Sequence, residues 1–538
     1  MTIISVKAFN GLKPILKPRL LGDNEAQVAQ NARLVSGSLE PLRGTTTLKA
    51  TSLFNPKTIF RYGTGATETN YWLEFANDTD VMRSPIPNDS YDRLYWTDGI
   101  NPPRYAPNSM ILSSQPYPGA FYQLGIPAPS APAITDFTTT AADKVPESRT
   151  YVVTYVSAYG EEGPPSDASA LTALDPTQAV TVTLPGAPSG SYNITLKRIY
   201  RSSTVGTSAQ FQFVTEVPVA NTTFVDTVAQ ADLAEVLPSE GWIAPPSDLK
   251  GLRMMANGAA VGFSGRTVHL SEPNMPHAWP HKYTIDYDIV GIAVYGQTVA
   301  VMTTAYPFLL QGADPAAMTP TKLEIPQACT SKRSIIENGD GVLYASPDGY
   351  VSLGAGINVI TQNMFSRDQW QAYAPASMDA YLYNGRIHLL YNTGTTRGML
   401  IIDGTGQGAV LTTCTYNSST AMTAGFYDAT TDTLYLAQNG SIMRFDRGSQ
   451  TMATWRSKLF RLPYQQNFAV AQVRASSYPV ILRVYADGAL KSETTVTSSD
   501  HFTLPGGFRA LDWEFEIDAP SEVSEINIAT SAAELKAV

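Results

Sequence analysis

The chain has 538 residues, of which 43% are apolar and only 16% charged, and its formal net charge is −10. Globular proteins carry about 25% charged residues, and disordered chains have a lower apolar content, so a packed core is expected and a disordered chain is excluded. The acidic balance disfavours a protein that holds duplex DNA on a basic surface. Two cysteines, Cys329 and Cys414, are too few for a disulfide-built scaffold, and we expect both thiols to be buried and reduced.

Residues 1–50 are expected to form an extended arm followed by one short helix. Two prolines within the first 20 residues keep the entry extended. Asp23 is placed to cap a helix that carries Val28, Ala29 and Ala32 on one face. The segment is also basic, because it contains seven Lys and Arg residues against three acids.

The following 200 residues have strand signatures. Residues 51–126 are assigned to the first propeller-like strands, with one blade-like unit at 70–98. Residues 127–246 are predicted to form a fibronectin type III-like β-sandwich, bounded by proline-rich linkers and expected to be inserted within the propeller. The strand runs that carry this prediction are 151–156, 180–184, 194–200 and 211–214.

Residues 247–451 repeat one pattern, a pair of short apolar strands around a turn. The pairs Asn384-Gly385 and Asn439-Gly440 are strong hairpin signals, because both central positions of a type I′ turn need a positive φ. The hairpins recur roughly every 45 to 50 residues, which indicates propeller blades. They lie at residues 292–302, 342–352, 380–391 and 433–445.

Two further elements complete the predicted fold. A capping box at residues 366–369 predicts a short helix ahead of Trp370. Residues 452–538 are predicted to form a second β-sandwich, since 480–490 read as a hairpin and 510–517 alternate apolar and acidic residues. The predicted fold class is therefore mainly β: a propeller-like body, a fibronectin III-like sandwich, a C-terminal sandwich and one or two short helices.

The sequence shows no recognisable catalytic set. His277 and His281 have the spacing of a helical metal pair, but Pro280 disrupts the helix that would bring them together, so a structured loop is favoured. Carboxylates are plentiful, yet the sequence places no two of them together as a glycosidase needs. We predict no enzyme activity, no cofactor and no metal.

Neither a signal peptide nor a membrane segment is predicted. The first residues lack a continuous apolar core, and no window approaches 18 uninterrupted apolar residues. We expect synthesis and folding in a cytoplasm and no membrane insertion.

Several segments, taken in order, resemble the tail nozzle proteins of short-tailed bacteriophages, which are virion structural proteins. Each motif alone is weak, and their order along most of the chain carries the resemblance. The motifs are residues 11–14 (GLKP), 20–32 (LLGDNEAQVAQNA), 37–44 (GSLEPLRG), 271–280 (SEPNMPHAWP), 342–349 (VLYASPDG), 454–458 (TWRSK) and 504–508 (LPGGF).

The resemblance implies a structural protein of the virion tail, made in the host bacterial cytoplasm. Such a protein forms a homo-oligomeric ring, commonly a hexamer, below the portal and adaptor, and conducts genomic DNA during ejection without binding it specifically. The head-to-tail adaptor is the implied partner, with tail fibres or a tail needle as further candidates. No catalytic residues are implied, and the motif residues are expected to be structural or to lie at interfaces.

Charge suggests two sets of interface residues. The basic residues Lys13, Lys17, Arg19 and Arg33 are candidates for contact with the adaptor. The acidic residues Asp512, Glu514 and Glu516 are candidates for a DNA channel, because a negative wall would repel phosphates and let DNA slide.

Two other function classes stay open from the sequence. One is a tail adhesin that binds a host glycan through loops of the propeller or sandwich. The other is a propeller glycosidase or depolymerase, against which stands the lack of a recognisable catalytic set.

Overall fold

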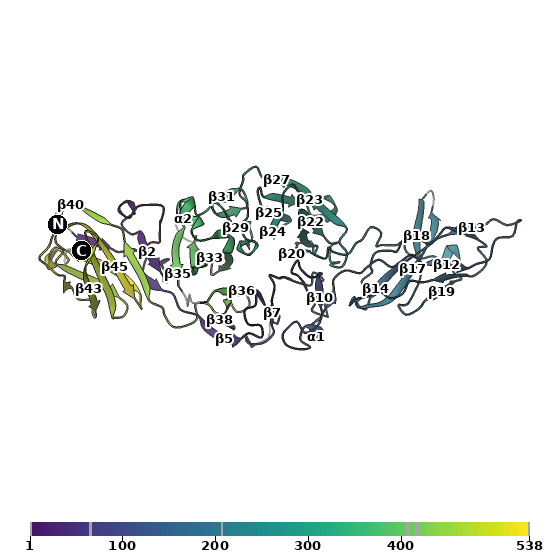
Figure 1. Ribbon diagram of the computed structural model, residues 1–538, viewed down its shortest axis with the longest axis horizontal. Helices are drawn as coiled ribbons and strands as arrows, with labels where there is room; N and C mark the ends of the chain where they lie inside the picture. The colour runs from purple at the N-terminus through teal and green to yellow at the C-terminus, as the bar shows by residue number, and fades with distance from the viewer. Residues whose placement is uncertain (1–2, 64–66, 206–207, 405–408, 416–419, 536–538) are drawn as a thin grey trace. The chain divides into compact units, whose positions relative to one another are not determined.

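The computed structural model describes residues 3–63, 67–205, 208–404, 409–415 and 420–535. It is almost entirely β (Figure 1), and the predicted fold class is confirmed. The chain divides into two compact units, one of residues 1–77, 302–307 and 323–538 (unit 1) and one of residues 78–301 and 308–322 (unit 2). Within the described ranges, no helix is long and apolar enough to cross a membrane.

Unit 2 contains three four-stranded sheets whose strands follow one another in chain order, as in a propeller blade. Two of them share a core that includes Tyr95, Leu252 and the fully buried Trp279. Their strands are β8 (Asp80–Arg83), β9 (Leu94–Thr97), β10 (Arg104–Ala106) and β11 (Tyr122–Gln123); β20 (Lys250–Met254), β21 (Ala260–Ser264), β22 (Thr267–Leu270) and β23 (His281–Thr284); and β24 (Ile289–Tyr295), β25 (Thr298–Thr303), β26 (Phe308–Gln311) and β27 (Thr319–Lys322).

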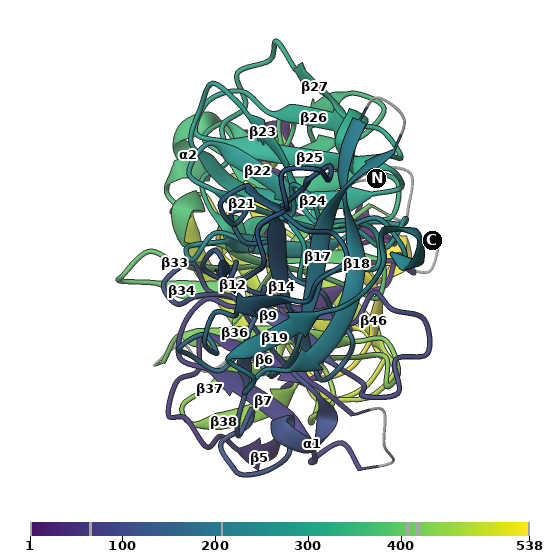
Figure 2. The ribbon, with the colours of Figure 1, turned by 90° about the vertical axis from the view of Figure 1, so that its right-hand side faces the viewer.

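Unit 2 also holds the sandwich strands, which lie in sequence between β11 and β20. Two three-stranded sheets pack through a core that includes Tyr151, Val182 and Ile199. The long strands β17 and β18 run side by side (Figure 2). The first sheet consists of β12 (Ala133–Asp136), β16 (Val180–Thr183) and β19 (Thr223–Asp226), the second of β14 (Tyr151–Ser157), β17 (Ile194–Val205) and β18 (Ser208–Pro218), and β13 (Glu147–Arg149) pairs with β15 (Thr172–Leu174).

Unit 1 contains further blade-like sheets, one of which is closed by a strand from near the N-terminus. β5 pairs with β38, so segments almost 400 residues apart share a sheet. The strands are β28 (Ile336–Glu337), β29 (Val342–Ser346), β30 (Gly349–Leu353) and β31 (Ile357–Val359); β32 (Asp379–Tyr383), β33 (Arg386–Asn392), β34 (Arg397–Asp403) and β35 (Val410–Cys414); β36 (Met422–Asp428), β37 (Thr433–Gln438), β38 (Ser441–Arg444) and β5 (Thr46–Ala50); and the pairs β6 (Thr58–Arg61) with β7 (Trp72–Phe75) and β3 (Ala32–Arg33) with β4 (Glu40–Pro41).

The C-terminal sandwich completes unit 1, and both ends of the chain meet in it (Figure 1). One sheet has the order β1 (Ile3–Val6), β46 (Val523–Ala529), β41 (Val470–Ala475) and β44 (Phe502–Thr503). The facing sheet is built from β2 (Ala26–Gln30), β39 (Ala453–Ser457), β45 (Ala510–Ala519), β42 (Val480–Ala486) and β43 (Ala489–Val496), with β40 (Phe460–Gln466) beside β45. Through β2 this sheet is continuous with β35 of the neighbouring blade-like sheet.

The predicted hairpins are confirmed, and the turns have the expected backbone. Asn384 and Gly385 have φ values of 54° and 72°, and Asn439 and Gly440 have 49° and 71°. These values match a type I′ turn, in which both central residues have positive φ. The preference of an Asn-Gly pair for positive φ therefore fixed the type of these two turns.

One predicted helix is confirmed and the other is wrong. α2 (Arg367–Gln371) begins with the expected capping box, in which Ser366 and Gln369 bond each other's backbone N–H. The helix predicted to start at Asp23 is instead β2, which lies between β35 and β39. Strand neighbours on both sides satisfy the backbone groups of β2, and this tertiary pairing outweighs the weak helical preference of an Ala- and Gln-rich segment.

The other helices in the described ranges are short: α1 (Asn108–Ile111), α3 (Ala532–Leu535) and the 3-10 turns η1 (Pro18–Leu20), η2 (Gln230–Asp232), η3 (Pro315–Ala317), η4 (Lys332–Ser334) and η5 (Pro375–Ser377).

The prediction of one blade-like unit at 70–98 is wrong, because its strands belong to two sheets. β7 pairs with β6, whereas β9 pairs with β8 and β10 in another sheet. Sequence spacing alone could not show that these strands have different partners. The domain boundaries near 50, 126, 246 and 451 stay predictions.

Candidate partner interface

The four basic residues proposed as adaptor contacts fall into two pairs with different surroundings. Lys13 forms an ion pair with Glu25, and Arg33 forms one with Asp446. Lys17 and Arg19 are exposed and form no ion pair within the part of the chain that the structure describes. Two of the four charges are thus used inside unit 1, and two are presented to solvent.

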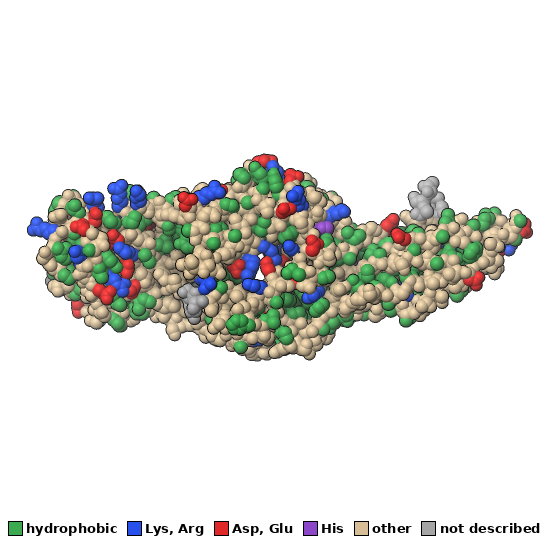
Figure 3. Space-filling model, in the orientation of Figure 1, with side chains coloured by type: hydrophobic (Ala, Val, Ile, Leu, Met, Phe, Trp, Pro, Cys, Tyr) green, Lys and Arg blue, Asp and Glu red, His purple; other side chains and the backbone are tan. Residues whose placement is uncertain are grey.

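Lys17 and Arg19 lie in residues 15–20, which we call the basic loop. Three apolar side chains of this loop are exposed as well: Ile15 at 42%, Leu16 at 37% and Leu20 at 59%. Single exposed apolar residues are common, but three of them beside two cations in six residues are typical of a surface that binds a protein. Figure 3 shows Lys and Arg side chains gathered along the upper edge of the part of unit 1 that holds β2 and β40.

The backbone of the basic loop is held in place at several points. The N–H of Ile15 donates to the carbonyl of Met364 at 2.9 Å, and the Gln369 amide of α2 donates to the carbonyl of Pro14 at 2.7 Å. The N–H of Leu459 donates to the carbonyl of Pro18 at 3.1 Å. A loop fixed in this way loses little conformational entropy when a partner binds.

A cavity of about 610 Å³ lies beside the N-terminal arm, within unit 1. The Lys, Arg, Asp and Glu side chains of its lining form three ion pairs: Lys13 with Glu25, Arg33 with Asp446, and Arg386 with Asp403. Positive and negative side chains are equal in number in these pairs, so the lining does not favour a ligand of either charge.

Burial and hydrogen bonds shift the pKa values of titratable groups around the cavity. Burial alone would raise the pKa of Glu25, but hydrogen bonds from Lys13 and from the N–H of Gly22 outweigh it and hold that pKa below its ordinary value. Burial lowers the pKa of His388 to about 4, so its imidazole is neutral at pH 7. The Glu25 pair links two residues of the arm, and the His388 ring packs against Tyr383 and Phe445.

The three acidic residues proposed for a DNA channel lie on one face of β45. The opposite face, with Trp513, Phe515 and Ile517, is buried in the sandwich core, so the predicted alternation is confirmed. Asp512 is 3.7 Å from the guanidinium of Arg461.

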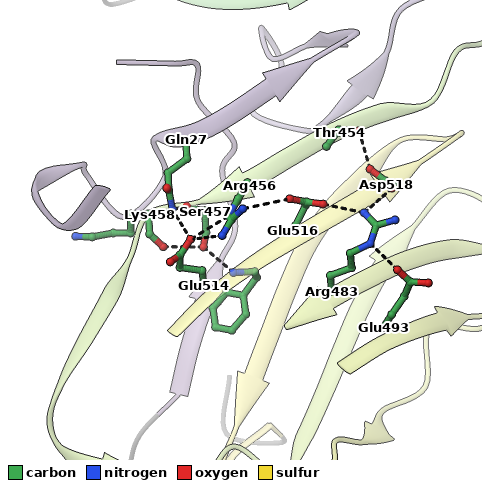
Figure 4. Close-up of polar contacts among 11 residues, drawn as sticks. Gln27, Thr454, Arg456, Ser457, Lys458, Arg483, Glu493, Glu514, Glu516 and Asp518 are labelled. Carbon is green, nitrogen blue, oxygen red and sulfur yellow. Dashed lines mark hydrogen bonds and ion pairs between the residues drawn. The ribbon is translucent and has the colours of Figure 1, made fainter. Parts of the chain in front are cut away.

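Glu514 and Glu516 take part in a network of ion pairs (Figure 4). The Glu514 carboxylate accepts hydrogen bonds from Arg456 at 2.9 Å and from Gln27 of β2 at 2.8 Å. Glu516 accepts a hydrogen bond from Arg483 at 2.8 Å. From the sequence, Arg456 was named only within the TWRSK motif and Arg483 only within the 480–490 hairpin, and neither was predicted to pair with these acids. The available signal was a basic residue on a strand that neighbours the acidic one.

The network extends to two further carboxylates. Arg483 also contacts Asp518 at 2.7 Å and Glu493 at 2.7 Å (Figure 4). These contacts, with those to Glu516, raise the pKa of the Arg483 guanidinium. Because two arginines pair with four carboxylates, this face keeps a net negative charge. That charge is smaller than the four carboxylates alone would give. Whether these acids face DNA stays a prediction.

The histidines and cysteines considered for metal or thiol chemistry pack against neighbouring side chains. His281 contacts Glu272 at 3.1 Å, whereas His277 is buried against Trp242 with ring centroids 5.7 Å apart. In the described ranges, no group of three His, Cys, Asp or Glu side chains is placed to hold a metal ion. Both cysteines are buried and free, as expected, and burial raises the pKa of each thiol to about 12.

Comparison with known proteins gives distant structural likenesses. No protein-family model matches the chain, and no curated protein matches its sequence. Among solved structures it is similar to Hsv2 of Kluyvelomyces marxianus at 7% identity, covering 48% of this chain and 69% of that one with a TM-score of 0.26. It is also similar to BBS1N in complex with ARL6DN at 10% identity, covering 52% of this chain and 88% of that one with a TM-score of 0.26. A third likeness is to the Pan2 WD40 domain of Neurospora crassa at 9% identity, covering 52% of this chain and 86% of that one with a TM-score of 0.26. Scores this low carry no argument, so the fold assignment rests on the sheet order of the chain itself.

Proposed function

We propose that this chain is a non-enzymatic structural subunit of a short-tailed phage tail. In this proposal several copies, commonly six, form a ring-shaped nozzle below the portal and adaptor, and genomic DNA passes through it during ejection. The adaptor, and beyond it tail fibres or a tail needle, are the proposed partners. The proposal starts from the ordered motifs that resemble the nozzle family.

The observation that carries the proposal is the use of these motif residues in packing. Gly11 lies so close to β35 that an added Cβ would meet the backbone oxygen of Leu411. The indole N–H of Trp279 donates to the carbonyl of Pro276 at 2.7 Å, and the side chain is fully buried. Arg456 holds Glu514 in the ion-pair network. Residues of these three motifs therefore support the scaffold where they lie, which favours a structural role.

The basic loop supports an assembled state. It begins directly after the GLKP motif and ends at the start of the LLGDNEAQVAQNA motif. Its exposed apolar side chains lose contact with water only when another molecule covers them, and that burial favours association. A protein whose task is to join neighbours in a virion needs such surfaces.

The proposal is tested with the purified full chain. We expect light scattering over a range of concentrations to give a mass of several subunits, and electron-microscope class averages to show a ring with a central hole. A single-subunit mass at every concentration, with no hole, would contradict the nozzle. Specific binding on a glycan array or clearing of a polysaccharide would favour the adhesin or the depolymerase instead.

A further inference from the structure

A second surface, on unit 2, has the charge opposite to that of the basic loop. It consists of residues 232–243, which we call the acidic edge. Asp232, Glu235 and Glu240 are exposed there and form no ion pair within the described ranges. Val236 is 44% exposed and Ile243 is 45% exposed beside them.

The acidic edge is also fixed by its backbone. Ala234 donates its N–H to the carbonyl of Phe213 at 3.0 Å, and the N–H of Phe213 donates to the carbonyl of Glu235 at 2.9 Å. The N–H of Trp279 donates to the carbonyl of Ile243 at 2.8 Å. Like the basic loop, this edge offers exposed side chains on a rigid support.

Many other charged side chains in the described ranges already have ion-pair partners. Asp288 pairs with Arg266 even though both are largely exposed, and Glu493 pairs with Arg483. By contrast, the basic loop offers two cations without an ion-pair partner, and the acidic edge offers three such carboxylates. Both surfaces add apolar side chains, so contact between them would bury apolar area while the charges select the partner.

We propose that the basic loop of one copy binds the acidic edge of the next copy. The inference rests on the proposed ring, for which it names the contact between subunits. Because two different surfaces of the same chain meet, the contact is heterologous, and repeating it gives a closed ring or an open filament. Lys17 and Arg19 would face Asp232 and Glu235, while Ile15 and Leu20 would pack against Val236.

Charge reversal on each surface tests the proposal. The variant Lys17→Glu/Arg19→Glu and the variant Asp232→Lys/Glu235→Lys should each weaken self-association about tenfold, because two exposed attractive pairs become repulsive. Sedimentation velocity over a concentration series measures the change, and circular dichroism checks the fold. The matched control is Lys57→Glu/Arg509→Glu, which makes the same change in charge at two other exposed cations and should assemble like the unmodified chain.

Mixing the two variants gives the sharpest result. Each variant alone opposes like charges, but in an equimolar mixture the reversed loop of one faces the reversed edge of the other, and the remaining loop and edge are native. We therefore expect assembly to return on mixing, and to return in the single chain that carries all four substitutions.

A cross-linking measurement does not depend on any variant. Carbodiimide coupling joins an amine to a carboxylate as an amide without a spacer, so Lys17 and Glu235 should be joined when they touch. In a mixture of ¹⁵N-labelled and unlabelled chains, a product with one labelled and one unlabelled peptide shows a contact between copies.

The outcomes separate the inference from the proposed function. Assembly of the unmodified chain with no effect of either reversal, or loss of adaptor binding alone, would overturn this contact and leave the ring in place. Failure of the unmodified chain to self-associate would overturn the ring and the contact together.

Discussion

At the scale of single residues, the ion-pair network on β45 depends on its two arginines. Glu514 is almost fully buried, and its hydrogen-bond partners include Arg456 and Gln27. A buried carboxylate that loses its cation keeps the cost of desolvation without compensation. The ion-pair network therefore stabilises the sandwich itself.

We predict that Arg456→Met lowers the stability of unit 1 by about 2–4 kcal/mol, because the buried Glu514 loses its charged partner. The shift of the midpoint in urea denaturation measures this loss. Arg461→Met is the matched control, since Arg461 is largely exposed and 3.7 Å from Asp512, and it should change stability by less than about 1 kcal/mol. Equal effects of the two substitutions would show that the burial of Glu514 is not what matters.

At the scale of elements, the N-terminal arm is locked to the sheet by close backbone contact. The N–H of Leu12 donates to the carbonyl of Leu411 at 2.8 Å, and the N–H of Ala26 donates to the carbonyl of Gly11 at 3.1 Å. An added Cβ on Gly11 would be 2.4 Å from the oxygen of Leu411. Glycine is needed here because two backbones approach each other and no side chain fits between them.

We predict that Gly11→Ala displaces the arm from β35 and costs about 1–3 kcal/mol, as overpacking of a fitted contact does. Hydrogen exchange at the amides of Leu12 and Ala26 should become faster, and the thermal midpoint should fall. Gly356→Ala is the control, because a Cβ there meets nothing within 4 Å. Unchanged exchange in Gly11→Ala would mean that the arm is not held by this contact.

At the scale of the whole molecule, the first and last segments of the chain form one sandwich. β1 pairs with β46, and β2 pairs with β39, so the sheets of the C-terminal region are incomplete without the N-terminal residues. Ile4 and Val6 of β1 are buried in the shared core. Removing residues 1–20 to probe the basic loop would therefore also damage the sandwich, and point variants are the better test.

We predict that residues 452–538, produced alone, do not fold, because they lack both N-terminal strands and expose two open sheet edges. Circular dichroism and proton NMR of the isolated fragment should show a largely unfolded chain. Adding a peptide of residues 1–34 should restore part of the β signal. A fragment that folds cooperatively by itself would show that β1 and β2 are dispensable.

Much of the fold follows from local sequence. Asn384-Gly385 and Asn439-Gly440 predicted their turns because positive φ is a property of those residues, and Ser366 with Gln369 predicted the start of α2 in the same way. The alternation along 510–517 predicted which face of β45 is buried. Of the candidate interface, the exposed cations Lys17 and Arg19 were identified from charge alone.

Only the tertiary structure decided which distant segments pair with each other and which charged side chains form ion pairs. Ala26 to Gln30 are a strand because β35 and β39 supply backbone partners from more than 380 residues away, which no local preference encodes. Lys13 and Arg33 are used by Glu25 and Asp446, so only Lys17 and Arg19 remain for a partner. By itself the sequence determined the Asn-Gly turns, the start of α2 and the buried face of β45, since those depend on neighbouring residues. Which strands meet, and which charges stay free, depended on the folded chain as a whole.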